Sequence, residues 1–219
     1  MGDRDSKIDH GSSNDVLLPV NDPFPEIQCL DVLEYSQSGG DEEGNNYQVF
    51  TPITVVNDMI DKIGRDYLDD IKTTVLEPTS GEGIFVANIL KSRLNKLRMN
   101  PATYKANSLR ALSTLYSIEI DERLVIIQRS NIYTVFCNSS KELGILDDEQ
   151  YFSLAKKIIH ENIMWAAFNM TEPNILSIEV GYKMPPTKKK KVLEFPVWTI
   201  GDDLDCKMKM EEFEHEWGQ

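Results

Sequence analysis

A short apolar run that ends in a turn with two glycines constrains the fold of this chain more than any other feature. Residues 73–76 (Thr-Thr-Val-Leu) are β-branched or apolar, and the turn runs from Glu77 to Gly83. After the turn, apolar residues recur at helical spacing from Ile84 to about Leu97. A buried strand that turns directly into a helix is typical of a parallel α/β sheet.

The rest of the chain continues this alternation of strands and helices. A second buried strand is predicted from Leu112 to Ile120, and Asp121 is placed to cap a helix that extends to about Ile132. Residues 96–108 are expected to form an inserted loop before this strand. The other predicted elements are helices from Thr51-Pro52 onward and over residues 147–160, and strands over 163–168, 175–182 and 192–200. This order predicts an α/β fold with a Rossmann-like sheet.

Acidic residues are concentrated at the start of the chain. The 219 residues include 36 acidic and 23 basic side chains, and the net charge is −13. Residues 1–46 alone carry −9, which predicts an acidic, partly disordered arm in front of a folded domain of residues 47–219. We interpret the arm as a solvated segment that lies partly on the body. The alternative is a segment that mimics nucleic acid or covers a basic site.

Charge, hydropathy and cysteine content disfavour several kinds of protein. A strongly acidic chain binds DNA weakly by itself, because phosphate contacts need a basic face. No apolar run approaches the ~18–20 residues of a membrane span. Cys29, Cys137 and Cys206 are far apart, so neither a disulfide framework nor a metal site is expected, and we predict a reduced, cytoplasmic protein. The run Lys188–Lys191 is read as a solvated loop, with phosphate contact or nuclear import as alternatives.

The glycine turn and an acid on the next strand suggest a nucleoside site. Glycine lets a backbone approach a ligand closely, and the helix that follows offers free N–H groups. Glu119 ends the second strand, where it could accept hydrogen bonds from both ribose hydroxyls, and Ile120 could pack on an adenine. Gly81 and Glu119 should then face each other at the carboxyl ends of adjacent parallel strands. The alternative is an ordinary turn beside a solvated acid. A dinucleotide site is less favoured, because Val86 stands where the third glycine is needed.

Three motifs in the first half of the chain resemble one enzyme family. Glu77-Pro78-x-x-Gly81-x-Gly83-x-Phe85 resembles the cofactor motif of the S-adenosylmethionine-dependent DNA adenine-N6 methyltransferases. Phe50-Thr51-Pro52 resembles the family's Phe-Thr-Pro motif, and residues 115–121 resemble the segment whose acid binds the ribose. The motifs occur in the family's order within residues 47–135. They are most similar to short bacterial and phage proteins labelled as modification subunits of restriction systems.

This resemblance implies a class I methyltransferase sheet with helices on both faces. It also implies S-adenosylmethionine as the cofactor and no metal. Asn169 loosely matches the residue that meets the adenine amine after the third strand. The implied cofactor-binding residues are Phe50, Thr51, Pro52, Glu77, Pro78, Thr79, Gly81, Gly83, Phe85, Glu119, Ile120 and Asn169.

The catalytic motif of the family departs from its usual form in this chain. The family has Asn/Asp-Pro-Pro-Tyr/Phe, whose polar groups accept the amine N–H bonds and whose ring stacks on a flipped base. Here the position is taken by Met184, Pro185, Pro186 and Thr187. The resemblance therefore implies either a DNA adenine methyltransferase that needs a partner protein for target recognition, or an inactive binding protein that acts in regulation or against restriction. A methyltransferase for a non-DNA substrate is a further alternative.

Overall fold

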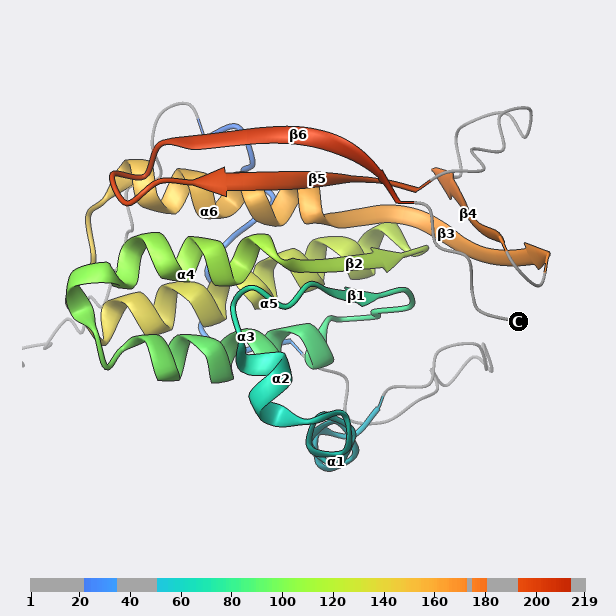
Figure 1. Ribbon diagram of the computed structural model, residues 1–219, viewed down its shortest axis with the longest axis horizontal. Coiled ribbons are helices and arrows are strands. Elements are labelled where there is room, and N and C mark those ends of the chain that lie inside the picture. The colour runs from blue at the N-terminus through green and yellow to red at the C-terminus, as the bar shows by residue number, and fades with distance from the viewer. Residues whose placement is uncertain (1–21, 35–50, 173–174, 181–192, 214–219) are drawn as a thin grey trace, which may run out of the picture.

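The computed structural model describes residues 22–34, 51–172, 175–180 and 193–213 (Figure 1). Side-chain surroundings are described for residues 22–34, 51–166 and 194–211. Among these residues, no helix has the length and apolar character that crossing a membrane requires.

Three parallel strands form the centre of the fold. These are β1 (Val75–Glu77), β2 (Leu115–Glu119) and β3 (Ile163–Glu172). β1 pairs with β2, and β2 pairs with β3, both in parallel. The predicted adjacency of the first two strands is therefore confirmed, and the fold is mixed α/β with a three-stranded parallel sheet.

A fourth strand runs against the other three. β4 (Ile175–Val180) pairs with β3 in antiparallel, and the order of the sheet is β1-β2-β3-β4. The strand itself was predicted, but its direction was not. Only two residues separate β3 from β4, whereas a parallel connection needs a crossover of about a dozen or more.

Each crossover between parallel strands contains two helices. α3 (Ile84–Leu97) and α4 (Tyr104–Ser113) lie between β1 and β2, with a short 3₁₀ turn at Pro101–Thr103. α5 (Glu122–Lys141) and α6 (Glu149–Asn162) lie between β2 and β3. α4 leads into β2 and α6 leads into β3 within one residue or directly, so each helix and strand form one long element in Figure 1.

Two of these helices differ from the sequence-based expectation. α4 occupies part of the predicted loop and the start of the predicted second strand, because Tyr104, Leu109 and Leu112 bury their side chains at helical spacing. α5 continues about two turns beyond Ile132, and its second half buries both apolar and polar side chains (Tyr133, Thr134, Val135, Phe136, Cys137, Ser139 and Ser140). The buried polar residues interrupt the apolar periodicity, so the pattern did not reveal this second half.

The two faces of the sheet are covered by different structures. Val75, Leu115 and Ile163 face a core built with α3 and α5, which contact β2. On the other face, Tyr116 packs against Phe195 of β5 at a ring-centroid distance of 5.0 Å and donates a hydrogen bond of 2.7 Å to the carbonyl of Pro196. β5 (Leu193–Ile200) and β6 (Cys206–Phe213) form an antiparallel hairpin. The expectation of helices on both faces is therefore corrected, because the described part of the second face carries this hairpin (Figure 1).

A buried arginine holds together the segments that lead into β1 and β2. Arg93 of α3 is fully buried and donates hydrogen bonds to the carbonyls of Leu68, Thr73 and Ala111 and to the hydroxyl of Thr114, over 2.7–3.0 Å. Burial lowers the pKa of this guanidinium to about 10. The side chain thus joins α2 (Arg65–Asp69), the approach to β1 and the end of α4.

Residues 22–34, called the strap below, lie along α5. Ile27 of the strap is fully buried in the main core. The backbone N–H of Leu30 donates to Thr134 Oγ1 at 2.8 Å, and that of Glu34 donates to Asn131 Oδ1 at 2.8 Å. Asp22 also forms a buried ion pair with Lys156. The described part of the predicted arm therefore lies on the body, as expected.

Candidate functional site

The predicted site lies where β1 and β2 end. In the parallel register Glu77 is opposite Ser117, so Glu119 extends two residues beyond β1 and reaches the glycine turn. The backbone N–H of Gly81 donates a hydrogen bond of 2.7 Å to Glu119 Oε2. The prediction that Gly81 and Glu119 face each other across adjacent parallel strands is confirmed.

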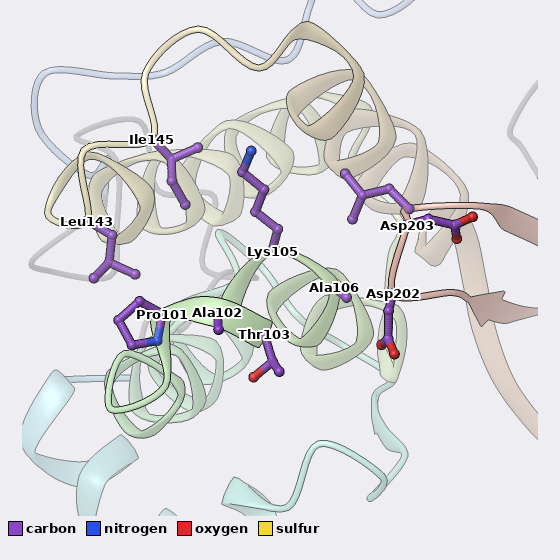
Figure 2. A pocket seen from close by; sticks show the side chains of 10 residues that line it. Pro101, Ala102, Thr103, Lys105, Ala106, Leu143, Ile145, Asp202 and Asp203 are labelled. Atoms are coloured by element: carbon purple, nitrogen blue, oxygen red, sulfur yellow. The ribbon is translucent and has the colours of Figure 1, made fainter.

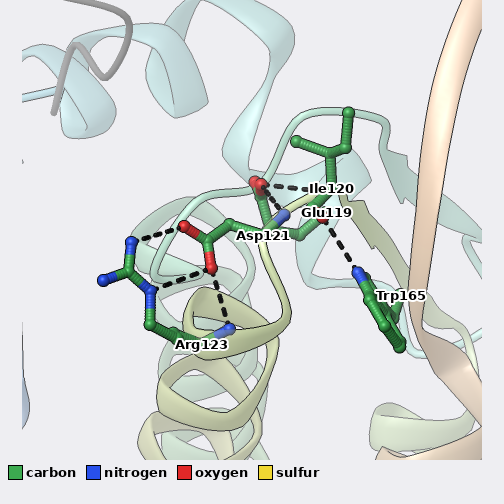
Figure 3. A network of polar contacts seen from close by, with 5 residues as sticks. All are labelled: Glu119, Ile120, Asp121, Arg123 and Trp165. Carbon is green, nitrogen blue, oxygen red and sulfur yellow. Dashed lines mark hydrogen bonds and ion pairs between the residues drawn. The ribbon is translucent and has the colours of Figure 1, made fainter. Parts of the chain in front are cut away.

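Among the described residues, the donors that hold the carboxylate of Glu119 are all backbone N–H groups. Its Oε1 accepts hydrogen bonds from the N–H groups of Ile120 and Asp121, at 2.8 and 3.0 Å. Figure 3 shows this network, with the indole of Trp165 donating to the carbonyl of Ile120 at 2.9 Å. Only 8% of Glu119 is exposed. Glu119 therefore links the glycine turn after β1 to the turn after β2.

Asp121 begins the helix after this acid, as predicted. Its Oδ1 accepts from the backbone N–H of Arg123 at 2.9 Å, and its Oδ2 pairs with the Arg123 guanidinium at 2.9 Å. The side-chain hydrogen bond from Arg123 lowers the pKa of Asp121. This cap keeps the amino-terminal end of α5 beside Glu119 (Figure 3).

The two glycines of the turn have different tasks. Gly83 adopts a left-handed conformation with φ of 80° directly before α3, and an added Cβ would lie 2.3 Å from Cγ of Gln128. Gly81 has φ of 54°, and an added Cβ would meet no heavy atom within 4 Å. Gly83 is therefore required by packing, whereas Gly81 presents bare backbone to open space beside Glu119.

A buried amide beneath the turn was not predicted from the sequence. Gln128 of α5 is fully buried, and its Oε1 accepts a hydrogen bond of 2.8 Å from the hydroxyl of Ser80. Its Nε2 is buried without a hydrogen-bond partner among the described residues. A glutamine in mid-helix gives no sequence signal, so only the fold brings it to the turn.

Glu77 carries a carboxyl group that is costly to ionise. The residue ends β1 and is half-buried, and burial raises its pKa to about 7. Within the described ranges its side chain has no hydrogen bond or ion pair. A half-buried acid of this kind gains most from a proton or from a cationic group of a ligand.

The remaining predicted cofactor residues are only partly brought to this end of the sheet. Pro78 and Thr79 belong to the turn, and Phe85 packs against the core from the first turn of α3. Ile120 is 45% exposed next to Glu119. Thr51 and Pro52 are exposed and precede α1 (Ile53–Ile63), the helix predicted from this point. Phe50 lies outside the described residues.

The predicted catalytic segment, Met184 to Thr187, also lies outside the described residues. Asn169 is in β3, where it pairs with Ser177, but its side chain is not among those described. Val180, the last residue of β4, is opposite Ala166, next to the Trp165 that pairs with Glu119. The described end of β4 is therefore level with the end of β2, two strands away from Glu119.

A cavity of about 440 Å³ lies elsewhere in the fold and contains none of the predicted site residues. Figure 2 shows it between the start of α4, the loop after α5 and the β5–β6 turn. α4 begins at this cavity and leads into β2, which ends in Glu119, so the cavity and the predicted site are at opposite ends of that long element (Figure 1). The cavity is lined by Pro101, Ala102, Thr103, Lys105, Ala106, Leu143, Ile145, Asp202, Asp203 and Leu204.

The described side chains include no group of three or more His, Cys, Asp or Glu residues that could hold a metal ion. Comparisons with protein-family models, with curated proteins and with solved structures found no match to this chain.

Proposed function

We propose that this chain binds S-adenosylmethionine at the carboxyl ends of β1 and β2 and is a methyltransferase-type protein. The observation that carries the proposal is the contact between the Gly81 N–H and the Glu119 carboxylate across two adjacent parallel strands. Open space over Gly81 leaves room for a ligand to approach the backbone there.

The hydrogen-bonding capacity of Glu119 fits a ribose. A carboxylate can accept about four hydrogen bonds, and three of these sites are used by backbone N–H groups. One ribose hydroxyl can therefore bind without breaking an existing contact. The second can bind by exchange with the Gly81 N–H, which would then face the ligand. The exposed side chain of Ile120 next to the acid suits the flat face of an adenine.

The other end of the ligand would meet groups of opposite charge. Glu77 is a half-buried carboxyl group with no described partner, and the amino-acid part of S-adenosylmethionine carries an ammonium. The first turn of α3 provides backbone N–H groups for the adjacent carboxylate. A dinucleotide is a poorer fit, because Val86 is buried in α3 where that motif needs a glycine.

Adenine methylation in DNA is the reaction that the three cofactor motifs support. When bound, the cofactor supplies an electrophilic methyl group, and the protein must accept the amine hydrogens and hold the base. Met184 offers only a weak sulfur acceptor, and Thr187 cannot stack on a base. These two residues favour a second candidate function, in which the chain binds the cofactor but transfers its methyl group very slowly or not at all.

The test of the binding proposal is a calorimetric titration of the full chain with S-adenosylmethionine and with S-adenosylhomocysteine. Gly81→Val should abolish binding, because its side chain would fill the open space over the turn. Gly144→Val is the matched control: Gly144 also has a positive φ, of 73°, with no heavy atom within 4 Å of an added Cβ, but it lies in the loop after α5. Equal affinity of the wild type and the Gly81 variant would refute the site.

Transfer of labelled methyl groups separates the two candidate functions. The full chain is incubated with labelled S-adenosylmethionine and unmodified duplex DNA, and in parallel with RNA and with protein. Binding without transfer to any acceptor supports the second candidate. Transfer to DNA at ordinary turnover rates contradicts it, and transfer to RNA or protein identifies a non-DNA substrate.

A further inference from the structure

Two cysteines that are distant in the sequence lie against each other in the fold. Cys29 belongs to the strap and is exposed, whereas Cys137 belongs to α5 and is only 5% exposed. Each thiol is the strongest single influence on the pKa of the other, so the two groups are neighbours. The spacing of the cysteines had suggested no disulfide pairing, and the strap is the element that brings the pair together.

The residues on both sides of Cys29 fix its position on α5. The backbone N–H of Gln28 donates to Ser130 Oγ at 3.4 Å, and that of Leu30 donates to Thr134 Oγ1 at 2.8 Å. Ser130, Thr134 and Cys137 follow one another in α5 at intervals of four and then three residues, so they share one face of this helix. The backbone register of the strap therefore places Cys29 beside the helix face that carries Cys137.

The surroundings give the two sulfurs different chemistry. The neighbouring Cys137 thiol, with the nearby charge of Lys141, lowers the pKa of Cys29 to about 6. The neighbouring Cys29 and burial raise the pKa of Cys137. Of the two sulfurs, the exposed one therefore ionises more readily, and the buried one keeps its proton. An accessible, readily ionised thiol beside a second thiol is the arrangement found in oxidation-sensitive pairs.

We propose that Cys29 and Cys137 are an oxidation site, at which a hydroperoxide converts the pair to a disulfide that ties the strap to α5. The Cys29 thiolate attacks the outer peroxide oxygen, the O–O bond breaks, and the leaving oxygen takes up a proton to give water or an alcohol. Cys29 becomes a sulfenic acid. The Cys137 sulfur then attacks the Cys29 sulfur, the S–O bond breaks, and the hydroxyl leaves as water with the Cys137 proton. The two thiols lose two electrons, and the peroxide gains them.

The disulfide would act on the candidate site through one side chain. Asn131 Nδ2 donates to the carbonyl of Glu34 at 2.8 Å and to the carbonyl of Glu82 at 3.0 Å. Glu34 is the last described residue of the strap, and Glu82 lies inside the glycine turn. Oxidation would therefore hold the strap against α5, and Asn131 of α5 also binds the glycine turn. This inference does not depend on which ligand the turn binds.

Peptide mapping of the full chain after treatment with hydrogen peroxide tests the proposal. The expected product is a reducible link between the Cys29 and Cys137 peptides within one chain. Cys206→Ser should leave the link unchanged, because burial raises the pKa of Cys206 and it lies in the β5–β6 hairpin. Cys29→Ser should abolish the link and leave Cys137 reduced. Over-oxidation of Cys29 beside a reduced Cys137, or links between two chains, would overturn the proposal.

Alkylation rates test the same pair in the wild-type chain, so no substitution of the buried Cys137 is needed. In the native wild-type chain, the reaction of Cys29 with iodoacetamide should rise with pH around 6 and reach a plateau by neutral pH. At pH 7 it should be at least about tenfold faster than the reaction of Cys206. Equal rates would contradict the assignment of the thiolate. Peroxide-treated wild type should also melt about 5–10 °C above the treated Cys29→Ser variant, because the new bond closes a loop of more than 100 residues.

Discussion

At the scale of single residues, Glu119 has a structural task that is independent of any ligand. Its carboxylate accepts three backbone hydrogen bonds, from Gly81, Ile120 and Asp121. Glu119→Ala should lower the free energy of unfolding by about 2–3 kcal/mol without cofactor, because it leaves these donors unpaired. Urea denaturation measures the loss. Glu122→Ala, an exposed acid in the first turn of α5, should cost less than about 1 kcal/mol.

The same substitution should also weaken S-adenosylmethionine binding, if the proposed function holds. The expected loss is ~1.5–3 kcal/mol, the range for hydrogen bonds to a charged group. Binding is measured at a denaturant-free condition where circular dichroism shows the variant to be folded. A folded Glu119→Ala variant that binds as well as the wild type would separate the structural task of this acid from the proposed ligand.

Glu77 should make the stability of the protein depend on pH. Its pKa in the folded state is raised to about 7, whereas an unfolded glutamate titrates at ~4.3. The folded state therefore binds this proton more tightly, so the contribution to stability is complete below the unfolded pKa and is lost as pH rises through 7. Glu77→Gln should remove this loss between pH 5 and 8 in urea titrations. Glu149→Gln, at an exposed acid of α6, should keep the wild-type dependence.

At the scale of the secondary-structure elements, Asn131 connects the strap, α5 and the glycine turn. The residue is fully buried, and its amide pairs with both backbone groups of Glu34 and with the carbonyl of Glu82. Asn131→Ala should destabilise the fold by about 2–3 kcal/mol and open the strap to proteases, because three polar groups lose their partner. Limited proteolysis with mass spectrometry locates the cleavage. Asn138→Ala, at an exposed position of the same helix, should leave the pattern unchanged.

The elements that sequence patterns predicted well are those whose burial is local and apolar. β1, the glycine turn and α3 follow directly from apolar spacing and glycine content, and with Glu119 they fix the predicted site. The second half of α5 was missed because buried polar residues such as Thr134, Ser139 and Ser140 interrupt its apolar pattern. Gln128 and the proximity of Cys29 to Cys137 were missed because long-range pairing leaves no periodic signal. No direction was predicted for β4, and its two-residue connection to β3 allows only an antiparallel pairing.

At the scale of the whole molecule, the strap makes part of the acidic arm contribute to stability. Removing residues 1–21 keeps the strap, whereas removing residues 1–46 takes away the buried Ile27 and leaves Lys156 without Asp22. Lys156 is only 6% exposed, and breaking a buried pair costs about 3–5 kcal/mol. The longer deletion should therefore lower the urea midpoint substantially more than the shorter one. Equal midpoints for both deletions would show that the strap contributes little to stability.

The position of the strap also has a consequence for the order in which the chain folds. Its hydrogen bonds join residues 97–104 positions apart, so they cannot form until α5 has been synthesised and has packed on α3. Such contacts carry a high loop-closure cost, so they are expected to form after the transition state for folding. Ile27→Ala should therefore accelerate unfolding and leave the refolding rate almost unaltered in stopped-flow measurements. During translation, the strap could dock only after α5, about 100 residues later in the chain, has left the ribosome.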